Sequence, residues 1–231
     1  MFEISPTEWT AILLSLRVAI VATLVATPLG IALAWLLARR DFWGKSMLDA
    51  LVHLPLVLPP VVTGYLLLLA LGRRGFFGAW LADHLGIVFA FRWTGAALAC
   101  GVMSFPLLVR PIRLSIEAID RRLEQASSTL GAAPWQVFAT VTLPLALPGV
   151  LAGMVLGFAK AIGEFGATIT FVSNIPGETQ TISSAIYSLI QTPDGDSAAM
   201  RLVIVSTVIA MGALIASEWF ARRATKRLHG N

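Results

Sequence analysis

Charged residues, histidines and cysteines are scarce in this sequence. Only 13% of the 231 residues are charged, compared with about 25% in an average soluble domain. Cys100 is the only cysteine, which excludes an intrachain disulfide, and no ligand set surrounds it in the sequence to suggest a metal site. The three histidines are scattered, and neither an H-E-x-x-H nor a G-x-S-x-G motif occurs. These absences argue against a disulfide scaffold, a metal centre and a hydrolase, including an intramembrane one.

Apolar residues are abundant instead. They make up 57% of the chain, and the mean hydropathy is +0.79. A water-soluble domain of this length has too little interior to bury so much apolar surface. The net charge of +4 and the pI near 9.8 are compatible with nucleic-acid binding. However, the basic residues form short clusters between apolar runs, which is typical of cytoplasmic loops beside anionic lipids. We therefore expect a protein of the lipid bilayer with no nucleic-acid partner.

Five apolar runs are long enough to cross a bilayer, which takes about 20 residues. Because hydrocarbon offers no hydrogen bonds to the backbone, the predicted fold class is all-α, a polytopic membrane protein with one transmembrane domain over residues 1–231. The third run begins at either Ile87 or Thr94, because Arg92 interrupts it. Residues 72–93 are interpreted as an interfacial or re-entrant segment rather than a sixth span. The predicted spans are about residues 11–38, 48–71, 87–109, 148–172 and 199–220.

The distribution of lysine and arginine predicts the orientation. If the N-terminus lies outside, the inner segments carry eleven basic residues and the outer segments carry four. The eleven are Arg39, Arg40, Lys45, Arg110, Arg113, Arg121, Arg122, Arg222, Arg223, Lys226 and Arg227, and the four are Arg73, Arg74, Arg92 and Arg201. Because basic loops stay in the cytoplasm, we expect the N-terminus outside and the C-terminus in the cytoplasm. The first run is too long for a signal peptide and should remain as an anchor.

The longest inner segment, about residues 110–147, is predicted to form a helix, a tight turn and a second helix. Gly131 suits the end of the first helix, and Pro134 suits the first turn of the next one. The segment faces the cytosol yet carries the large apolar side chains of Trp135 and Phe138. Two interpretations stay open: a hairpin lying on the bilayer surface, or a docking element that inserts Trp135 into a partner.

Part of this segment resembles the EAA loop of ABC importer permeases, whose pattern is E-A-A-x-x-x-G, nine residues, then I-x-L-P. Gly131 and the Leu143-Pro144 pair stand at the family spacing, whereas Gln125 replaces the usual Glu and Glu124 stands one position early. Ser and Val also replace the second Ala and the Ile. The resemblance implies that these helices sit in a cleft of a separate ATPase subunit. The ATPase-coupling residues it implies are Glu124, Gln125, Ala126, Gly131, Trp135, Phe138, Leu143 and Pro144.

The chain itself offers no ATP site. Gly44-Lys45-Ser46 matches the end of a P-loop motif, but the first glycine of that motif would fall at Arg39. The resemblance therefore implies that ATP and Mg bind to a partner subunit and that this chain holds no cofactor. It also implies a homodimer of permease chains with two ATP-binding subunits.

The fourth predicted span carries a stripe of small residues and an ionisable pair. The small residues recur every four positions, at Gly149, Gly153, Gly157 and Ala161. Such a stripe allows close helix packing, either within the subunit or at a subunit interface. Lys160 and Glu164 either pair on one helix face, or Glu164 lies in the pathway wall or at a gate. Arg17 in the first span leaves the same choice between a structural charge partner and a pathway cation.

Residues 163–181 indicate which branch of the permease family the sequence resembles. Residues 163–168 read G-E-F-G-A-T, similar to oxyanion importer permeases of the molybdate and sulfate branch, and residues 173–181 read S-N-I-P-G-E-T-Q-T, similar to molybdate permeases. A tetrahedral dianion can be held by hydroxyls, amides and backbone N–H groups. The pathway or gate candidates are Glu164, Thr168, Thr170, Ser173 and Asn174. The alternative for the four uncharged ones is that they cap helices and turns.

The amphipathic segment at residues 179–191 is expected at the outer interface or at the mouth of the pathway. The resemblance implies that a soluble oxyanion-binding protein delivers substrate to this face. We predict a non-catalytic permease subunit of an ATP-driven importer of molybdate, or of the similar tungstate, in the bacterial cytoplasmic membrane. The alternatives are a sulfate-type permease of the same family and a secondary oxyanion transporter without an ATPase. Against the latter, the sequence shows no internal repeat and no chain of intramembrane acids.

Overall fold

The structure is a computed structural model that describes residues 4–229, with the backbone alone for residues 217–218 and 220–229. Every regular element in that range is helical, which confirms the predicted all-α fold class. Four helices are long and apolar enough to cross a membrane, and a bent helix pair makes a fifth candidate. The elements are α1 (Pro6–Arg39), α2 (Lys45–Val57), α3 (Pro60–Leu71), α4 (Phe76–Leu85), α5 (Trp93–Glu117), α6 (Arg121–Thr129), α7 (Pro134–Val137), the π-helix η1 (Phe138–Thr142), α8 (Leu143–Ile162), α9 (Gly166–Val172), α10 (Ile182–Leu189) and α11 (Asp196–His229).

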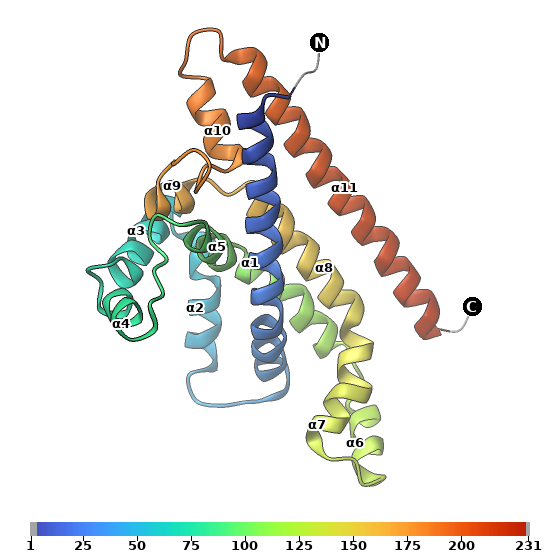
Figure 1. The fold of residues 1–231 in the computed structure, drawn as a ribbon. Helices are drawn as coiled ribbons and strands as arrows, with labels where there is room; N and C mark the ends of the chain where they lie inside the picture. The colour runs from blue at the N-terminus through green and yellow to red at the C-terminus, as the bar shows by residue number, and fades with distance from the viewer. Residues whose placement is uncertain (1–3, 230–231) are drawn as a thin grey trace.

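α1 contains the whole first predicted span and begins earlier, at Pro6. A capping box starts the helix: the Glu8 N–H donates to Ser5 Oγ at 3.2 Å, and the Ser5 N–H donates to Glu8 Oε2 at 2.6 Å. Pro28 does not end the helix, which continues to Arg39. α1 therefore runs lengthwise from the end where α10 lies, here called the N-terminal end, to the end where α6 and α7 lie, the hairpin end (Figure 1).

The second predicted span, residues 48–71, is not one straight helix. It is divided into α2 and α3, whose axes differ in direction by 115°. The break coincides with Pro59-Pro60. A proline lacks the backbone N–H that continues a helix and also disfavours helical geometry in the residue before it. α3 consequently turns away from α2 across the side of the molecule (Figure 1).

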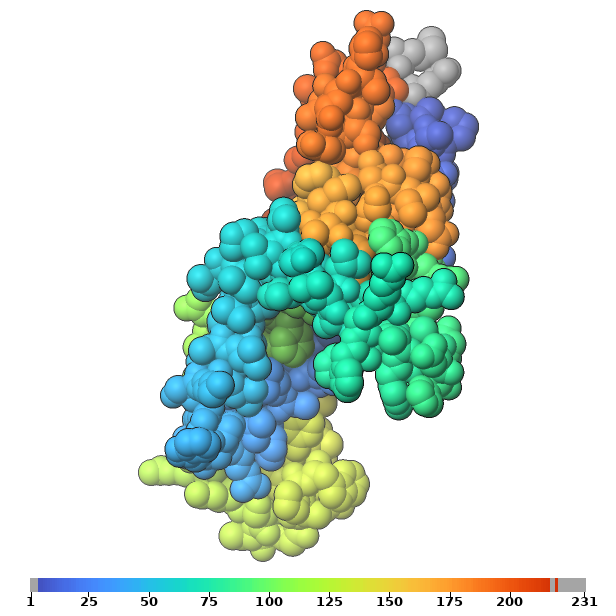
Figure 2. All heavy atoms as spheres, turned by 90° about the vertical axis from the view of Figure 1, so that its left-hand side faces the viewer, coloured from blue at the N-terminus to red at the C-terminus, as the bar shows by residue number. Residues whose placement is uncertain are grey.

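The segment after α3 forms a short helix rather than a span. α4 has 10 residues, about half the length that crossing a bilayer requires. It exposes the aromatic side chains of Phe76, Phe77 and Trp80. Amphipathic aromatic rings favour the boundary between lipid and water. This helix therefore has the character expected of an interfacial segment. Figure 2 shows α3 and α4 overhanging a hollow in the surface beside α2.

The third and fifth predicted spans correspond to α5 and α11, with different ends. α5 begins at Trp93, so the later of the two predicted starts is correct, and it continues to Glu117.

The helix formed by α7, η1 and α8 begins at Pro134. The inner segment predicted over residues 110–147 therefore includes the end of α5 and the start of α8, and the part that projects beyond the spans is shorter than expected.

The fourth predicted span, residues 148–172, is also broken. α8 ends at Ile162, and α9 begins at Gly166. A Cβ on Gly166 would lie 2.7 Å from Pro60 Cβ, and one on Gly64 would lie 2.5 Å from the Ala167 carbonyl oxygen. The two broken spans thus meet closely, with α9 packed against α3, because glycine lets the backbones approach.

The small-residue stripe on α8 packs within the subunit, against α5. A Cβ on Gly149 would lie 2.6 Å from the Pro111 carbonyl oxygen, and one on Gly153 would lie 2.6 Å from that of Leu108. At the far end of the stripe, Cys100 Sγ contacts the Ala161 carbonyl oxygen at 3.6 Å. Intrasubunit packing is therefore the correct interpretation of the stripe. α5 lies between α1 and α8 and forms the centre of the bundle.

Candidate functional site

The coupling hairpin, defined here as residues 120–137, has caps and a turn that follow from its sequence. Asp120 caps α6 by accepting the Arg122 N–H at 2.9 Å. Gly131 has φ +89°, the left-handed conformation that favours glycine. Pro134 begins α7, and the Gln136 side chain accepts the Ala133 N–H at 2.7 Å. The helix, turn and helix expected from the sequence are present at these positions.

The tip of this hairpin exposes apolar side chains. Leu130 is 89% exposed and Trp135 is 70% exposed. Gln125 and Ala126 on α6 are exposed as well, and α6 contains no buried residue. An exposed tryptophan is suited to a partner's pocket, because tryptophan is among the residues that contribute most to binding energy at interfaces. The exposed leucine adds to the apolar surface of the tip.

Phe138 and Trp135 are separated, although the sequence predicts both as docking residues. Phe138 packs edge-to-face against Trp35 of α1, with ring centroids 6.1 Å apart and an interplanar angle of 79°. Leu143 packs against the apolar core at the hairpin end. Pro144 is exposed in the first turn of α8, where its missing N–H leaves no hydrogen bond unmade. Trp135 is thus available to a partner, whereas Phe138 and Leu143 attach the hairpin to the spans.

Glu124 of the hairpin contacts side chains from two other elements of the subunit. Its Oε2 lies 3.1 Å from Arg39 Nε at the end of α1, and its Oε1 accepts the Thr142 hydroxyl at 2.6 Å. Arg39 Nη2 also donates to the Ile119 carbonyl oxygen at 3.3 Å. The carboxylate that stands one position early in the EAA pattern is therefore engaged inside the subunit. Sequence reasoning missed Arg39 and Thr142 as its partners.

A second ionic cluster joins α2 to α5 near the hairpin end. Arg113 lies 2.8 Å from Asp49 Oδ1 and 2.8 Å from Glu117 Oε1. His53 Nδ1 lies 3.5 Å from Asp49 Oδ1. This cluster attaches α2, which buries only Val52, to the central helix. Neither the hydropathy pattern nor the motifs indicated this contact.

Lys160 and Glu164 form an ion pair across the break between α8 and α9. Lys160 Nζ lies 2.7 Å from Glu164 Oε2, and the Glu164 side chain is 1% exposed. Glu164 Oε1 accepts the Ala167 N–H at 3.0 Å. The carboxylate therefore caps α9 and neutralises Lys160. Of the two interpretations of this pair, the geometry favours mutual pairing, although Lys160 lies at the end of α8 and Glu164 lies within the break, so the pair does not follow one helix face.

The remaining pathway candidates lie around α9 and the loop after it. The Thr168 hydroxyl donates to the Phe165 carbonyl oxygen at 2.9 Å, and the Thr170 hydroxyl donates to that of Gly166 at 2.8 Å. Asn174 Nδ2 donates to Ser188 Oγ at 2.7 Å. The two threonine hydroxyls are engaged by the backbone of the first turn of α9, and the Asn174 amide links the loop to α10. These contacts favour a structural role for the three residues. Their role in a pathway stays a prediction.

Ser173 differs from the other candidates because it is exposed. Its φ is +65° and its ψ is −163°, a conformation that is almost confined to glycine. Thr179, which sequence reasoning did not select, holds this loop: its hydroxyl donates to the Ser173 carbonyl oxygen at 3.3 Å and accepts the Ile175 N–H at 2.9 Å. Ser173 is thus the one predicted pathway hydroxyl that faces away from the protein interior.

Other charged groups join elements toward the N-terminal end. The Arg17 guanidinium lies over the Trp93 ring, 3.8 Å from its centroid. Arg17 thus has an aromatic partner, which neither sequence interpretation foresaw. Arg201 Nη2 donates to Glu8 Oε1 at 2.8 Å and joins α11 to α1. Ser15 of α1 accepts the Ile182 N–H at 2.7 Å, so α1 also caps α10.

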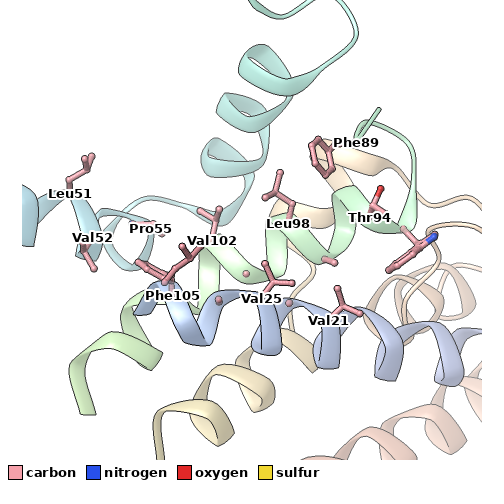
Figure 3. A pocket seen from close by; sticks show the side chains of 16 residues that line it. Val21, Val25, Leu51, Val52, Pro55, Phe89, Thr94, Leu98, Val102 and Phe105 are labelled. Atoms are coloured by element: carbon pink, nitrogen blue, oxygen red, sulfur yellow. The ribbon is translucent and has the colours of Figure 1, made fainter. Parts of the chain in front are cut away.

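An apolar groove lies between α1, α2 and α5, with a volume of about 610 Å³. Figure 3 shows its lining, with Val21 and Val25 from α1, Leu51 from α2, and Leu98 and Phe105 from α5. The polar side-chain groups in this lining belong to a threonine and a tryptophan. Such a surface does not suit a hydrated dianion, which needs several hydrogen-bond donors. Among the side chains that the structure describes, no group of His, Cys, Asp and Glu is placed to hold a metal ion.

Comparison with known proteins gives consistent matches over nearly the whole chain. Residues 26–228 match the family described as binding-protein-dependent transport system inner membrane component. The chain is 62% identical over 220 residues to the molybdenum transport system permease protein ModB of Escherichia coli strain K12, which covers 95% of this chain and 96% of that protein. It is 58% identical over 221 residues to the protein of that name from Haemophilus influenzae, covering 96% of each.

A solved structure shares the fold. It is the crystal structure of a bacterial alginate ABC transporter in complex with an alginate pentasaccharide-bound periplasmic protein. The TM-score is 0.75 at 20% identity, over 96% of this chain and 81% of that one.

Proposed function

This chain belongs to the family of binding-protein-dependent transport system inner membrane components, and we propose that it is the permease subunit of a molybdate ABC importer. The observation that carries the substrate is the 62% identity to a molybdenum transport permease over 95% of the chain. The chain is a non-catalytic membrane subunit. The energy for transport therefore comes from a separate partner that binds and hydrolyses ATP with Mg.

The coupling hairpin is the proposed contact with that ATPase subunit. Trp135 and Leu130 present an apolar tip beyond the spans, and exposed aromatic side chains are typical anchors at protein interfaces. Gly131 and Pro134 set the turn between the two helices. A partner that binds the tip can move the two hairpin helices together.

Two copies of the chain are proposed to form one pathway, with one ATPase subunit on each hairpin. The apolar groove of a single copy does not suit an oxyanion. The pathway is therefore placed between copies, with Glu164 and Ser173 as the candidates to be tested near it. ATP-driven closure of the ATPases would move the hairpins and tilt the spans between inward-open and outward-open states.

We place the hairpin end in the cytoplasm and the N-terminal end outside, in the bacterial cytoplasmic membrane. The end of α1 and the start of α2 meet at the hairpin end (Figure 1). Arg39 and Lys45 lie at these helix ends and Arg40 lies between them, and basic residues favour the cytoplasmic side. A soluble oxyanion-binding protein would then deliver its substrate to the N-terminal end, near α10 and the loop held by Thr179. The alginate transporter with a similar fold is in complex with a periplasmic protein that binds an alginate pentasaccharide.

Co-purification in mild detergent tests the docking role of Trp135. We expect Trp135→Asp to remove the ATPase subunit from the purified complex, because a charged side chain cannot replace an apolar anchor in a partner's pocket. Trp43→Asp is the matched control: Trp43 is fully exposed in the loop between α1 and α2 but lies outside the hairpin. Retention of the ATPase by Trp135→Asp, in the same amount as the control, would contradict the docking assignment.

Uptake into liposomes tests the substrate and the energy source. The complete complex should take up molybdate only when ATP and the binding protein are present, and excess sulfate should compete weakly. Molybdate uptake by this chain alone, without ATP, would replace the importer with a secondary transporter. Equal uptake of sulfate would move the chain to the sulfate-type alternative.

A further inference from the structure

One carboxylate at the base of the coupling hairpin joins three segments that are far apart in sequence. Glu124 belongs to α6, Arg39 ends α1, and Thr142 ends η1. Glu124 lies 3.1 Å from Arg39 Nε and accepts the Thr142 hydroxyl at 2.6 Å. Arg39 also reaches the Ile119 carbonyl oxygen, just before α6, at 3.3 Å. We call these three side chains the hairpin lock.

Among the side chains that the structure describes, the hairpin lock links α6 to α1 through the Arg39–Glu124 pair. α6 has no buried residue, so apolar burial contributes little to holding this helix in place. The second half of the hairpin is held differently, because α7 and η1 continue directly into α8, and Phe138 packs on Trp35. Without the lock, α6 would keep its chain ends and its contacts with α7 and η1, but it would lose its side-chain link to α1 through Arg39.

The lock is shielded from water. The side chains of Arg39 and Glu124 are 9% and 18% exposed, and Thr142 is buried. Hydrogen bonds to ionised groups are stronger than neutral ones, and partial burial reduces their screening by salt. The Lys45–Asp41 pair nearby offers a contrast, because its aspartate side chain is 91% exposed. Exposed pairs of that kind contribute little.

The direction of the side chains separates Glu124 from the docking surface. Gln125, Ala126 and Trp135 are exposed, whereas the Glu124 carboxylate is occupied by Arg39 and Thr142. A carboxylate whose two oxygens are both engaged inside the subunit is poorly placed to contact a partner. Its position suits a link between the hairpin and the spans.

We propose that Glu124 is a positioning residue that ties the coupling hairpin to α1 through Arg39, so that a displacement of the hairpin moves α1 together with α8. This role rests on the proposed function of the hairpin as the ATPase contact. Without the lock, the ATPase would still bind and hydrolyse ATP, but its motion would reach α1 only through the Phe138–Trp35 contact, besides the chain connections to α5 and α8. Transport would then be uncoupled from hydrolysis.

The test measures molybdate imported per ATP hydrolysed, in liposomes that contain the complete complex and the binding protein. The variants are Glu124→Ala, Arg39→Gln and the charge swap Arg39→Glu with Glu124→Arg. Lys45→Gln is the matched control, because it removes an exposed ion pair at the same end of the molecule. The amount of ATPase subunit in each purified complex is measured in parallel.

We expect both single variants to keep the ATPase subunit and its hydrolysis, while the import ratio falls by about fivefold or more, as for loss of a typical coupling free energy. The charge swap should restore most of the ratio, and the control should leave it unchanged. A merely structural role would lower import and hydrolysis together, through loss of assembled complex. The ratio of molybdate imported to ATP hydrolysed therefore distinguishes a coupling role from a merely structural one.

Several results would overturn the proposal. An unchanged ratio in either assembled single variant would show that the lock does not transmit motion. Loss of the ATPase from Glu124→Ala but not from Arg39→Gln would make Glu124 an ATPase contact. Failure of both single variants to assemble, with no recovery in the swap, would assign the pair to folding. The proposed function fails separately, if the unmodified complex imports no molybdate or contains no ATPase.

Discussion

Two glycines in this chain are constrained for different reasons. Gly131 needs a positive φ at an open turn, where a side chain would meet nothing within 4 Å. Gly153 needs space, because a Cβ there would lie 2.6 Å from the Leu108 carbonyl oxygen. The sequence predicts the first from its place between two helical segments. It predicts the second only as one of two packing alternatives, because the pattern does not identify the helix that faces the stripe.

Substitution of Gly153 should weaken the packing of α8 on α5. We expect Gly153→Ala to lower the free energy of unfolding by about 1–3 kcal/mol, as overpacking of a close contact does. The thermal midpoint of the purified protein in detergent measures this. Gly212→Ala is the matched control, because a Cβ at Gly212 of α11 meets nothing within 4 Å. Equal midpoints for the two variants would contradict the close approach of α5 and α8.

Substitution of Gly131 should affect coupling and leave the spans in place. Gly131→Pro imposes a φ near −65° where the turn has +89°, so the hairpin should lose its shape and transport should stop. Gly131→Ala should act more mildly, since a left-handed alanine costs about 1–2 kcal/mol. Molybdate uptake, compared with the amount of inserted protein, checks both. Full uptake by Gly131→Pro would contradict the role of the turn.

The Glu124 contacts show where sequence reasoning stops at this scale. The Arg39–Glu124 pair joins residues 85 positions apart, and the Thr142–Glu124 pair joins residues 18 apart. A motif shows that a carboxylate is displaced by one position, but it does not show which side chains surround that carboxylate. The partners depend on how α1, α6 and η1 come together, which only the folded chain determines.

At the scale of elements, hydropathy predicts where the long apolar segments lie, but it does not predict whether each segment forms one continuous helix. Two of the five predicted spans are broken, one at Pro59-Pro60 and one between Ile162 and Gly166. The sequence carried signals for both breaks, since prolines and glycines disfavour helix interiors. Hydropathy does not respond to them, because a broken span is as apolar as an intact one. The first span tolerates Pro28 within a continuous helix, so a single proline does not by itself predict a break.

The Lys160–Glu164 pair lies at the break between α8 and α9. Removing the cation alone by Lys160→Met leaves a buried carboxylate unpaired, which typically costs about 3–5 kcal/mol. The double variant Lys160→Met with Glu164→Gln should recover most of this loss, because a neutral amide oxygen can still accept the Ala167 N–H. Thermal midpoints in detergent, measured for the single and the double variant, test the pair. A double variant that is less stable than Lys160→Met would show that the carboxylate has another partner.

At the scale of the whole molecule, the orientation is open to a direct measurement. Cys100 is fully buried and serves as an unreactive background. We expect Glu178→Cys, in the exposed loop beyond α9, to react with a membrane-impermeant thiol reagent added to intact cells. Ser128→Cys, exposed on the hairpin, should react only after the membrane is opened. The opposite pattern would invert the proposed topology.

The continuous helix from Pro134 to Ile162 has a mechanical consequence. Its 29 residues correspond to a lever arm of about 43 Å at about 1.5 Å per residue. Trp135, the proposed ATPase contact, lies at one end of this helix. The other end is at Ile162, just before Gly163. Gly149 and Gly153, near the middle of this helix, pack closely on α5. A swing of about 10° about that point carries each end about 4 Å, in opposite directions. A displacement of the hairpin by the ATPase is thus converted into a displacement of similar size at the junction with α9.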